Sequence, residues 1–206
     1  YFNREGYVRN TTTGDYGDSR ETFAGRAQLR WTPTDKLELL FTASGYKFDD
    51  GLQPGSPLGQ DPYTVSRNFD GYDRQQADIE SLRSTYTADA FKVVSISSHS
   101  GWRESLWQDS DYMPFDVAQT RYTRKMQQWR EELRIESANE ISPWHWRAGG
   151  FAGSKSLDTD QTTSFTSPFP ADQGAVQKND DRKYALFGEV TRELNDQFEL
   201  TGGVRF

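Results

Sequence analysis

The chain has 206 residues, a formal net charge of −7 and no cysteine. An acidic chain does not suit nucleic acid, whose phosphates are bound by Lys and Arg, and without cysteine there are no disulfides, thiol nucleophiles or zinc–thiolate sites. No run approaches the roughly 18 apolar residues of a membrane-spanning helix. A membrane β-barrel is still possible, because the apolar residues of its strands alternate with polar ones.

The first element in chain order is a hairpin around Pro33. Over residues 23–31 every second residue is apolar or small, and a second alternating run follows over residues 37–45. A period of two predicts strands with one apolar and one polar face. Pro33 cannot donate to a strand ladder and Thr34-Asp35 favours a turn, so we expect a tight antiparallel hairpin. Residues 1–8 are a candidate additional strand before it.

The same pattern recurs three times along the chain. Alternating segments flank candidate turns at Asp89-Ala90, at residues 139–143 and at Asn195-Asp196. Longer connections are expected over residues 49–76, 109–123 and 159–181. The segment TRKMQQWREELRIESANE, residues 123–140, has a composition that also suits a helix, but its continuation into a turn and another strand favours β structure.

Short turns at one end and long loops at the other are typical of an outer-membrane barrel, whose strands need about 9–11 residues to cross a bilayer. The predicted fold class is all-β, an antiparallel transmembrane β-barrel segment of about eight to nine strands with short periplasmic turns and long extracellular loops. A soluble β-sandwich is the alternative, although its turns recur more closely along the chain.

In such a barrel the alternating apolar residues face lipid and the opposite faces line the lumen. The residues predicted to face the lumen are Arg26, Arg30, His99, Arg103, Arg130, Glu132 and Arg134. A charge on the lipid side would cost roughly 2–4 kcal/mol at mid-membrane, so the alternation is strongly constrained.

Motifs for catalysis or metal binding are not apparent. The two histidines, His99 and His145, lie on different hairpins, and no nucleophile triad, phosphate loop or helical zinc motif is present. Asp109, Asp111 and Asp116 offer carboxylates to calcium, but their segment lacks the glycine and the spacing of an EF-hand loop. We therefore expect no enzyme, no cofactor and no metal site.

Six phrases of the sequence have the character of barrel strands and extend over nearly the whole chain. They are REGYVRN, DSRETFAGRAQLRWTPTDKLELLFTASGYKFDDG, FKVVSISSHSGWRES, WREELRIES, WHWRAGGFAGSK and YALFGEVTRELNDQFELTGGVRF. In their order and spacing they resemble strand phrases of TonB-dependent outer-membrane receptors. Members of this family have a TonB box and a plug domain followed by a barrel of about 22 strands. The resemblance implies that residues 1–206 are a middle portion of such a barrel, without the plug domain and the remaining strands.

The resemblance also implies a function, a location and a set of partners. The expected protein takes up a scarce nutrient, with a ferric siderophore as the leading ligand, across the outer membrane of a Gram-negative-type bacterium. The TonB complex would act through the missing plug, and outer-membrane lipid would surround the barrel. Aromatic rings and guanidinium groups on the loops and outer strand ends suit an anionic chelate. The candidate ligand-binding residues are Tyr63, Arg67, Tyr72, Tyr112, Phe115, Arg121 and Tyr122.

Two other functions stay open from the sequence. One is a complete eight-stranded outer-membrane barrel with a structural or adhesive role, whose interior would hold side chains only. The other is a soluble carbohydrate-binding sandwich, which would not depend on detergent.

Overall fold

The computed structural model describes the chain except residues 53–54, 56–58, 60, 139–141, 167 and 169. The described part contains the strands β1 (Phe2–Arg4), β2 (Arg9–Asn10), β3 (Arg20–Thr34), β4 (Leu37–Asp50), β5 (Thr64–Val65), β6 (Tyr72–Thr87), β7 (Phe91–Asp109), β8 (Ala118–Ser137), β9 (Trp144–Phe165), β10 (Ala171–Asn195) and β11 (Phe198–Arg205). Within these residues no helix has the length and apolar character needed to span a membrane.

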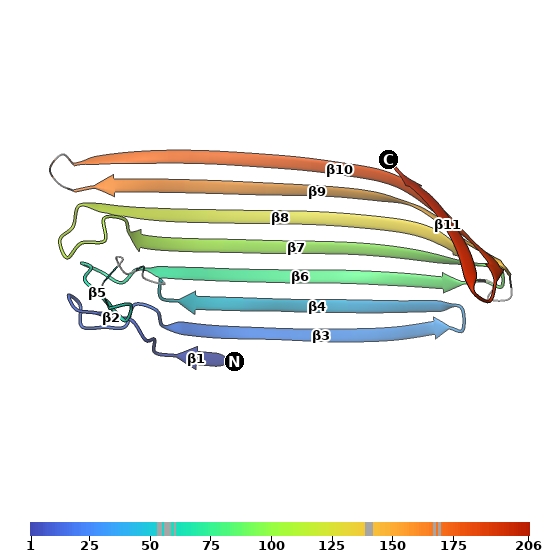
Figure 1. Cartoon of the computed structure of the whole chain (residues 1–206), viewed down its shortest axis with the longest axis horizontal. Coiled ribbons are helices and arrows are strands. Elements are labelled where there is room, and N and C mark those ends of the chain that lie inside the picture. Colours follow the sequence, from blue (N-terminus) through green and yellow to red (C-terminus); the bar gives the residue numbers. More distant parts are fainter. Residues whose placement is uncertain (53–54, 56–58, 60, 139–141, 167, 169) are drawn as a thin grey trace.

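Nine of the strands form one sheet in the order β1-β3-β4-β6-β7-β8-β9-β10-β11, and every neighbouring pair is antiparallel. The long strands run side by side along the molecule, with β1 and β11 at the two edges (Figure 1). The small parallel pair β2-β5 lies at the end opposite the short turns (Figure 1). The all-β antiparallel architecture predicted from the alternation is therefore confirmed.

Three of the four short turns are described, and they lie where the sequence predicted them. They join β3 to β4, β6 to β7 and β10 to β11. In the first turn Thr34 Oγ1 accepts the N–H groups of Lys36 and Leu37, at 3.3 and 3.1 Å. The ladder shifts register between Trp31 and Thr34, which accommodates Pro33 at a position where no ladder donor is needed. The turn expected at residues 139–143 includes residues outside the described part of the chain.

The expected long connections were wrong in their extent. Strands β7 and β8 leave only residues 110–117 between them, and β9 and β10 leave only residues 166–170. The first connection shortens to residues 51–71 and contains β5. Segment 123–137 is strand throughout, so the helical alternative does not hold for it. The outer parts of these strands are polar on both sides, so they carry no alternation by which to recognise them.

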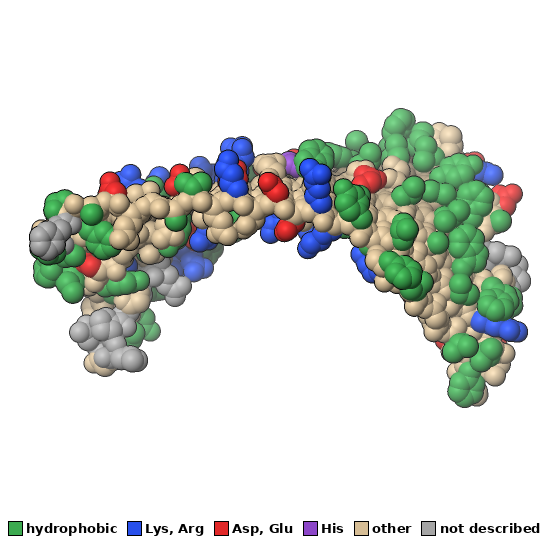
Figure 2. Space-filling view, turned by 90° about the horizontal axis from the view of Figure 1, so that it is seen from above, with side chains coloured by type: hydrophobic (Ala, Val, Ile, Leu, Met, Phe, Trp, Pro, Cys, Tyr) green, Lys and Arg blue, Asp and Glu red, His purple; other side chains and the backbone are tan. Residues whose placement is uncertain are grey.

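Cross-strand register sorts the side chains onto two faces. Leu29 pairs with Phe41, and Phe41 pairs with Leu82. We call the face that carries these residues the apolar face; it continues through Leu133 on β8 and Leu186 on β10. Leu29, Leu133 and Leu186 are 65%, 55% and 69% exposed. The sheet is arched, and hydrophobic side chains gather at the end with the short turns (Figure 2).

The opposite face, which we call the polar face, carries charged side chains that pair with their neighbours. It holds Arg26, Arg30, Arg130, Glu132 and Arg134. Arg30 Nε donates to Glu38 at 2.9 Å, and Arg134 Nη1 donates to Glu132 at 3.1 Å. These contacts run along the sheet between adjacent strands or within one strand.

His99 and Arg103 were placed on the wrong face. His99 pairs with Trp129 across β7 and β8, whereas Ile96 pairs with Glu132. His99 and Arg103 therefore lie on the side of Leu133, opposite the other five residues of the predicted lumen-facing set. The cause is the sequence of β7, in which Val93 and Val94 are adjacent and serines occur at both odd and even positions. The alternation therefore does not show which side chains share a face, and pairing with β6 and β8 decides it.

Candidate ligand-binding site

The connection between β4 and β6 is tied to the N-terminal segment through the β2-β5 pair. Arg9 N donates to Tyr63 O at 2.9 Å, and Thr11 N donates to Val65 O at 2.8 Å. Asn10 is fully buried between them. Its Nδ2 donates to Arg67 O (3.1 Å) and to Asp70 Oδ1 (2.8 Å), while its Oδ1 accepts the N–H of Arg67 (3.1 Å). One buried amide thus fixes the backbone on both sides of Arg67.

Asp18 organises the beginning of the chain in a similar way. Its Oδ1 accepts the N–H groups of Tyr7 and Val8, at 2.7 and 2.8 Å, and its Oδ2 accepts Arg4 Nη2 at 3.0 Å. Gly6 has a φ of +118°, and a Cβ at that position would lie 2.7 Å from Asp18 Oδ1. Glycine is therefore required for the chain to wrap around this carboxylate.

These two segments and the strand ends enclose a cavity of about 590 Å³, within the size range of small-molecule sites. The loops supply Tyr7, Tyr63, Arg67 and Tyr112, and the strands supply Arg4, Arg20, Asp50, Asp73 and Gln108. Arg20, Asp50 and Asp73 are cross-strand partners on the polar face. The Arg67 guanidinium carbon lies 4.6 Å from the centre of the Tyr112 ring, a cation–π contact.

Arg67 is the charged group of this cavity with the most nitrogen atoms that lack a hydrogen-bond partner among the described residues. It is 2% exposed, and among the described residues neither Nε nor Nη2 has a hydrogen-bond partner. Burial lowers the pKa of the Arg67 guanidinium from its ordinary value, and nearby Asp109, Tyr112 and Asp70 oppose that change. A guanidinium still remains charged in a protein, and a buried charge without full pairing is costly. Such a group is suited to receive the oxygens of an anionic ligand.

The carboxylates near Arg67 accept hydrogen bonds from the loop backbone. Asp109 Oδ1 accepts the N–H groups of Asp111 and Tyr112, at 3.1 and 2.8 Å, and burial raises the pKa of Asp109 above its ordinary value. Asp111 Oδ2 accepts the N–H groups of Val117 and Ala118, at 3.0 and 2.7 Å. Asp109 Oδ1 and Asp111 Oδ2 are therefore occupied by backbone amides, whereas Asp109 Oδ2 is buried without a hydrogen-bond partner among the described residues.

The seven predicted ligand residues do not form one site. Tyr63, Arg67 and Tyr112 line the cavity together. Tyr122 lies on the polar face of β8, where Arg124 stacks on it at 5.1 Å. Tyr72 and Arg121 lie on the other face, where both contact Trp107. The ring centres of Tyr72 and Trp107 are 6.0 Å apart, and Arg121 Cζ lies 4.7 Å from the centre of the Trp107 ring. Phe115 is exposed in the β7–β8 connection.

Sequence reasoning missed the contribution of the N-terminal segment to the cavity. Arg4, Tyr7 and Arg20 line it, although residues 1–8 were taken only as a candidate strand. The contact between this segment and the β4–β6 connection spans more than 50 residues of sequence, as in the Asn10–Arg67 bond. The local pattern contains no signal for a contact of that kind.

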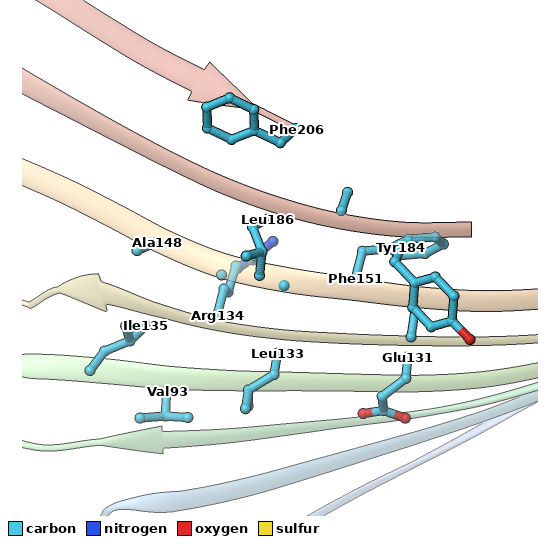
Figure 3. A pocket seen from close by; sticks show the side chains of 14 residues that line it. Val93, Glu131, Leu133, Arg134, Ile135, Ala148, Phe151, Tyr184, Leu186 and Phe206 are labelled. Atoms are coloured by element: carbon cyan, nitrogen blue, oxygen red, sulfur yellow. The ribbon is translucent and has the colours of Figure 1, made fainter. Parts of the chain in front are cut away.

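A larger hollow, of about 930 Å³, lies on the apolar face (Figure 3). It follows β9, where Ala148, Gly150 and Ala152 lie between the larger side chains Leu133 on β8 and Leu186 on β10. Its lining is mostly apolar, and Glu131 and Arg134 are the charged residues among it.

The fold and the cavity define a class of structure: an antiparallel sheet, apolar on one exposed face, with short turns at one end and a structured loop cluster at the other. No protein-family model matches the chain. Among solved structures it is similar to the ferric yersiniabactin uptake receptor FyuA from Yersinia pestis, with a TM-score of 0.85 and 20% identity over 98% of this chain and 32% of that chain. It is also similar to the ferric citrate transporter FecA in its unliganded form, with a TM-score of 0.60 and 11% identity over 92% of this chain and 36% of that chain.

The chain thus spans about a third of the length of both receptors. At these identities the similarity establishes the fold. The resemblance to TonB-dependent receptors, first found in the sequence phrases, is confirmed at that level.

Proposed function

We propose that this chain is part of the β-barrel wall of an outer-membrane receptor that takes up a ferric siderophore in a Gram-negative-type bacterium. Uptake would depend on the TonB complex, acting through a plug domain outside this chain. The fold similarity to two ferric-chelate receptors supports the class of transporter. The exposed apolar face and the Arg67 cavity support the membrane setting and the ligand.

The apolar face has the height expected of a bilayer-spanning band. On β8, β9 and β10 most of its hydrophobic side chains fall within residues 129–137, 144–152 and 184–192, next to the short turns. Glu131 is a charged residue on this face within the first segment, and Val176 and Leu194 lie outside the third. Each segment has about nine residues, close to the number that a tilted strand needs to cross the hydrocarbon core. In this setting Trp31, Trp144 and Trp146 lie near one interface, as the aromatic residues of membrane barrels do.

Beyond this band the same face becomes polar. Strand β8 presents Arg121, Thr123, Lys125 and Gln127 there. The outer parts of β8, β9 and β10 would therefore project from the membrane as a polar extension of the wall. The polar face, with Arg26, Arg30, Arg130, Glu132 and Arg134, would line the lumen.

The observation that carries the ligand proposal is the buried, incompletely paired Arg67 in a cavity that also presents Tyr63 and Tyr112. Carboxylate or catecholate oxygens of a ferric chelate would bond to the free Nε and Nη2 donors. The Tyr112 ring covers the guanidinium, so it would move aside on binding. Tyr112 has a φ of +58°, a conformation unfavourable for a tyrosine, which favours such a rearrangement.

Binding by the intact receptor in detergent tests this proposal. Ferric citrate and ferric yersiniabactin are suitable probes, and at least one should bind and quench intrinsic fluorescence. Loss of a charge-assisted hydrogen bond costs about 1.5–3 kcal/mol, so Arg67→Gln should weaken binding about 10-fold to 150-fold. Arg121→Gln, on the other face, is the matched control and should bind like the parent. Equal affinities of both variants would refute the assignment of Arg67.

The mass of the intact polypeptide distinguishes this proposal from a stand-alone small barrel. A band near 23.6 kDa on a denaturing gel of the membrane fraction would favour the small barrel. A band several times larger would accommodate the plug and the remaining wall.

A further inference from the structure

Three potential metal-ligating side chains converge on the apolar face at the outer edge of its hydrophobic band. Asp78 and Glu80 lie on β6, and His99 lies opposite Glu80 on β7. One ligand atom from each lies within 4.8 Å of the others. His99 Nδ1 is 3.1 Å from Glu80 Oε2 and 4.0 Å from Asp78 Oδ2. We propose that these three residues bind a divalent transition-metal ion of the Zn²⁺ type.

The surroundings hold the histidine in the orientation that such a site needs. The ring of His99 packs against Trp129 with a centroid distance of 4.4 Å. Its Nε2 lies 2.7 Å from Gln127 Oε1, so an N–H at Nε2 donates to that oxygen. Nδ1 donates to Glu80 Oε2 at 3.1 Å, and a metal ion would take the place of that proton. A hydrogen bond from the second ring nitrogen is the usual way in which metal-ligating histidines are oriented.

Gly101 makes room for Asp78 in the same cluster. It is the cross-strand partner of Asp78, and a Cβ at this position would lie 2.7 Å from Asp78 Oδ2. A larger residue would displace the carboxylate from the side of His99. The glycine therefore allows a donor set from two strands to converge.

The charge balance of the cluster favours a cation. Asp78 and Glu80 are neighbours on one face of β6, and among the described residues neither forms an ion pair with Lys or Arg within 4.0 Å. The basic residues closest in register on this face are Lys47, Arg103 and Lys125. None of the three pairs with these carboxylates, and in the described part of the chain their ion-pair partner is the His99 imidazole.

The donor set selects the class of ion. One imidazole nitrogen and two carboxylate oxygens suit Zn²⁺ or a neighbouring transition metal, whereas Ca²⁺ and Mg²⁺ prefer oxygen donors throughout. Tetrahedral coordination at about 2.0–2.1 Å places ligand atoms about 3.3 Å apart. The Glu80–His99 distance already fits, and Asp78 needs to move toward His99 by less than ~1 Å. The three ligand atoms, which lie within 4.8 Å of one another, need to close by at most ~1.5 Å. Three protein ligands leave a fourth position for water or an external ligand.

This inference goes beyond the proposed receptor function and does not depend on it. The cluster lies on the opposite face from the Arg67 cavity, and the ion would bridge β6 and β7. Bound metal should therefore stabilise the folded protein against heat, because it binds the folded chain and not the separated strands.

Titration of the intact receptor in detergent with Co²⁺, followed by displacement with Zn²⁺, tests the site. His99→Phe keeps the ring packing on Trp129 but removes both nitrogens, and Asp78→Asn removes one charge. His145→Phe is the matched control, since His145 faces a single carboxylate, Glu193, at 3.2 Å. The parent and His145→Phe should show visible Co²⁺ absorption, with at least 10-fold weaker binding in His99→Phe and Asp78→Asn.

A second readout is the thermal midpoint with and without Zn²⁺. It should rise with metal in the parent and in His145→Phe, and should not change in His99→Phe. Co²⁺ affinity that is unchanged in both His99→Phe and Asp78→Asn would overturn the proposal, as would absence of binding to the parent. Each variant is first shown to be folded by its heat-modifiable mobility on a gel.

Discussion

Asn10→Asp should open the loop cluster that carries Arg67. The substitution preserves side-chain size but removes both Nδ2 hydrogen bonds, to Arg67 O and to Asp70 Oδ1. A hydrogen bond to a charged group contributes about 1.5–3 kcal/mol and an ordinary one about 1 kcal/mol, so the loss is about 2.5–4 kcal/mol. The new carboxylate also takes the place of a donor 2.8 Å from Asp70, which adds repulsion.

Amide hydrogen exchange of the intact protein measures this opening. A loss of about 2.5–4 kcal/mol corresponds to exchange about 70-fold to 1,000-fold faster in peptides that contain residues 61–68, or to complete loss of protection. Thr11→Val is the matched control, because it removes one ordinary bond, from Thr11 Oγ1 to Val65 O at 3.1 Å, and should accelerate exchange only about fivefold. If Asn10→Asp exchanged no faster than Thr11→Val, the buried amide would not be what holds the cluster together.

Three further predictions concern the wall. Leu133→Arg should destabilise the lipid-inserted protein by about 2–4 kcal/mol, whereas Gln128→Arg on the polar face should be tolerated. Unfolding by urea in vesicles measures both variants, and equal midpoints for the two would contradict the assignment of faces. Gly149→Val should disrupt folding, because a Cβ there meets Leu133 O and Phe187 Cζ at 2.6 Å, whereas Gly25→Val, with nothing within 4 Å, should give a parental folded fraction. Burial raises the pKa of Glu104 from its ordinary 4.5, against an opposing effect of Arg124, so the folded state keeps its proton to higher pH than the unfolded chain does. Stability should therefore fall as the pH rises above about 4.5, and Glu104→Gln should flatten the plot of thermal midpoint against pH; an unchanged slope would exclude this carboxyl as the source.

The hairpins could be predicted because their signals are local. Around Pro33 the alternation of each strand and the turn chemistry of Thr34-Asp35 agree, and the same combination recurs at Asp89-Ala90 and Asn195-Asp196. Each signal requires only residues adjacent in sequence. Because an antiparallel hairpin is itself a local structure, the sequence specifies the sheet order almost completely.

The errors arose where a local pattern was ambiguous or absent. In β7, Val93-Val94 and the serines permit both parities, so His99 and Arg103 were assigned to the wrong face. In the outer parts of β8 to β10 both faces are polar, and strands were mistaken for loops. The ladder bonds to neighbouring strands decide both cases. For His99 the partners are Glu80 and Trp129, which lie 19 and 30 residues away.

The Arg67 cavity shows why a site is harder to predict than a fold. Tyr63, Arg67 and Tyr112 were selected by chemical type, and the structure does bring them together. Tyr72, Arg121 and Phe115 have the same chemistry and lie elsewhere. What separates the two groups is the contact of Asn10 with the β4–β6 connection, which no local pattern reveals.

The two candidate sites can be tested separately because a strand has a period of two. Strand β6 contributes Asp73 to the cavity on the polar face, and Asp78 and Glu80 to the metal cluster on the apolar face. A substitution at one parity leaves the other face of the strand intact. We therefore expect His99→Phe to bind ferric chelate like the parent, and Arg67→Gln to bind Co²⁺ like the parent. If both ligands were lost in either variant, the cause would be a general defect in the sheet, and neither site could be assigned from that variant.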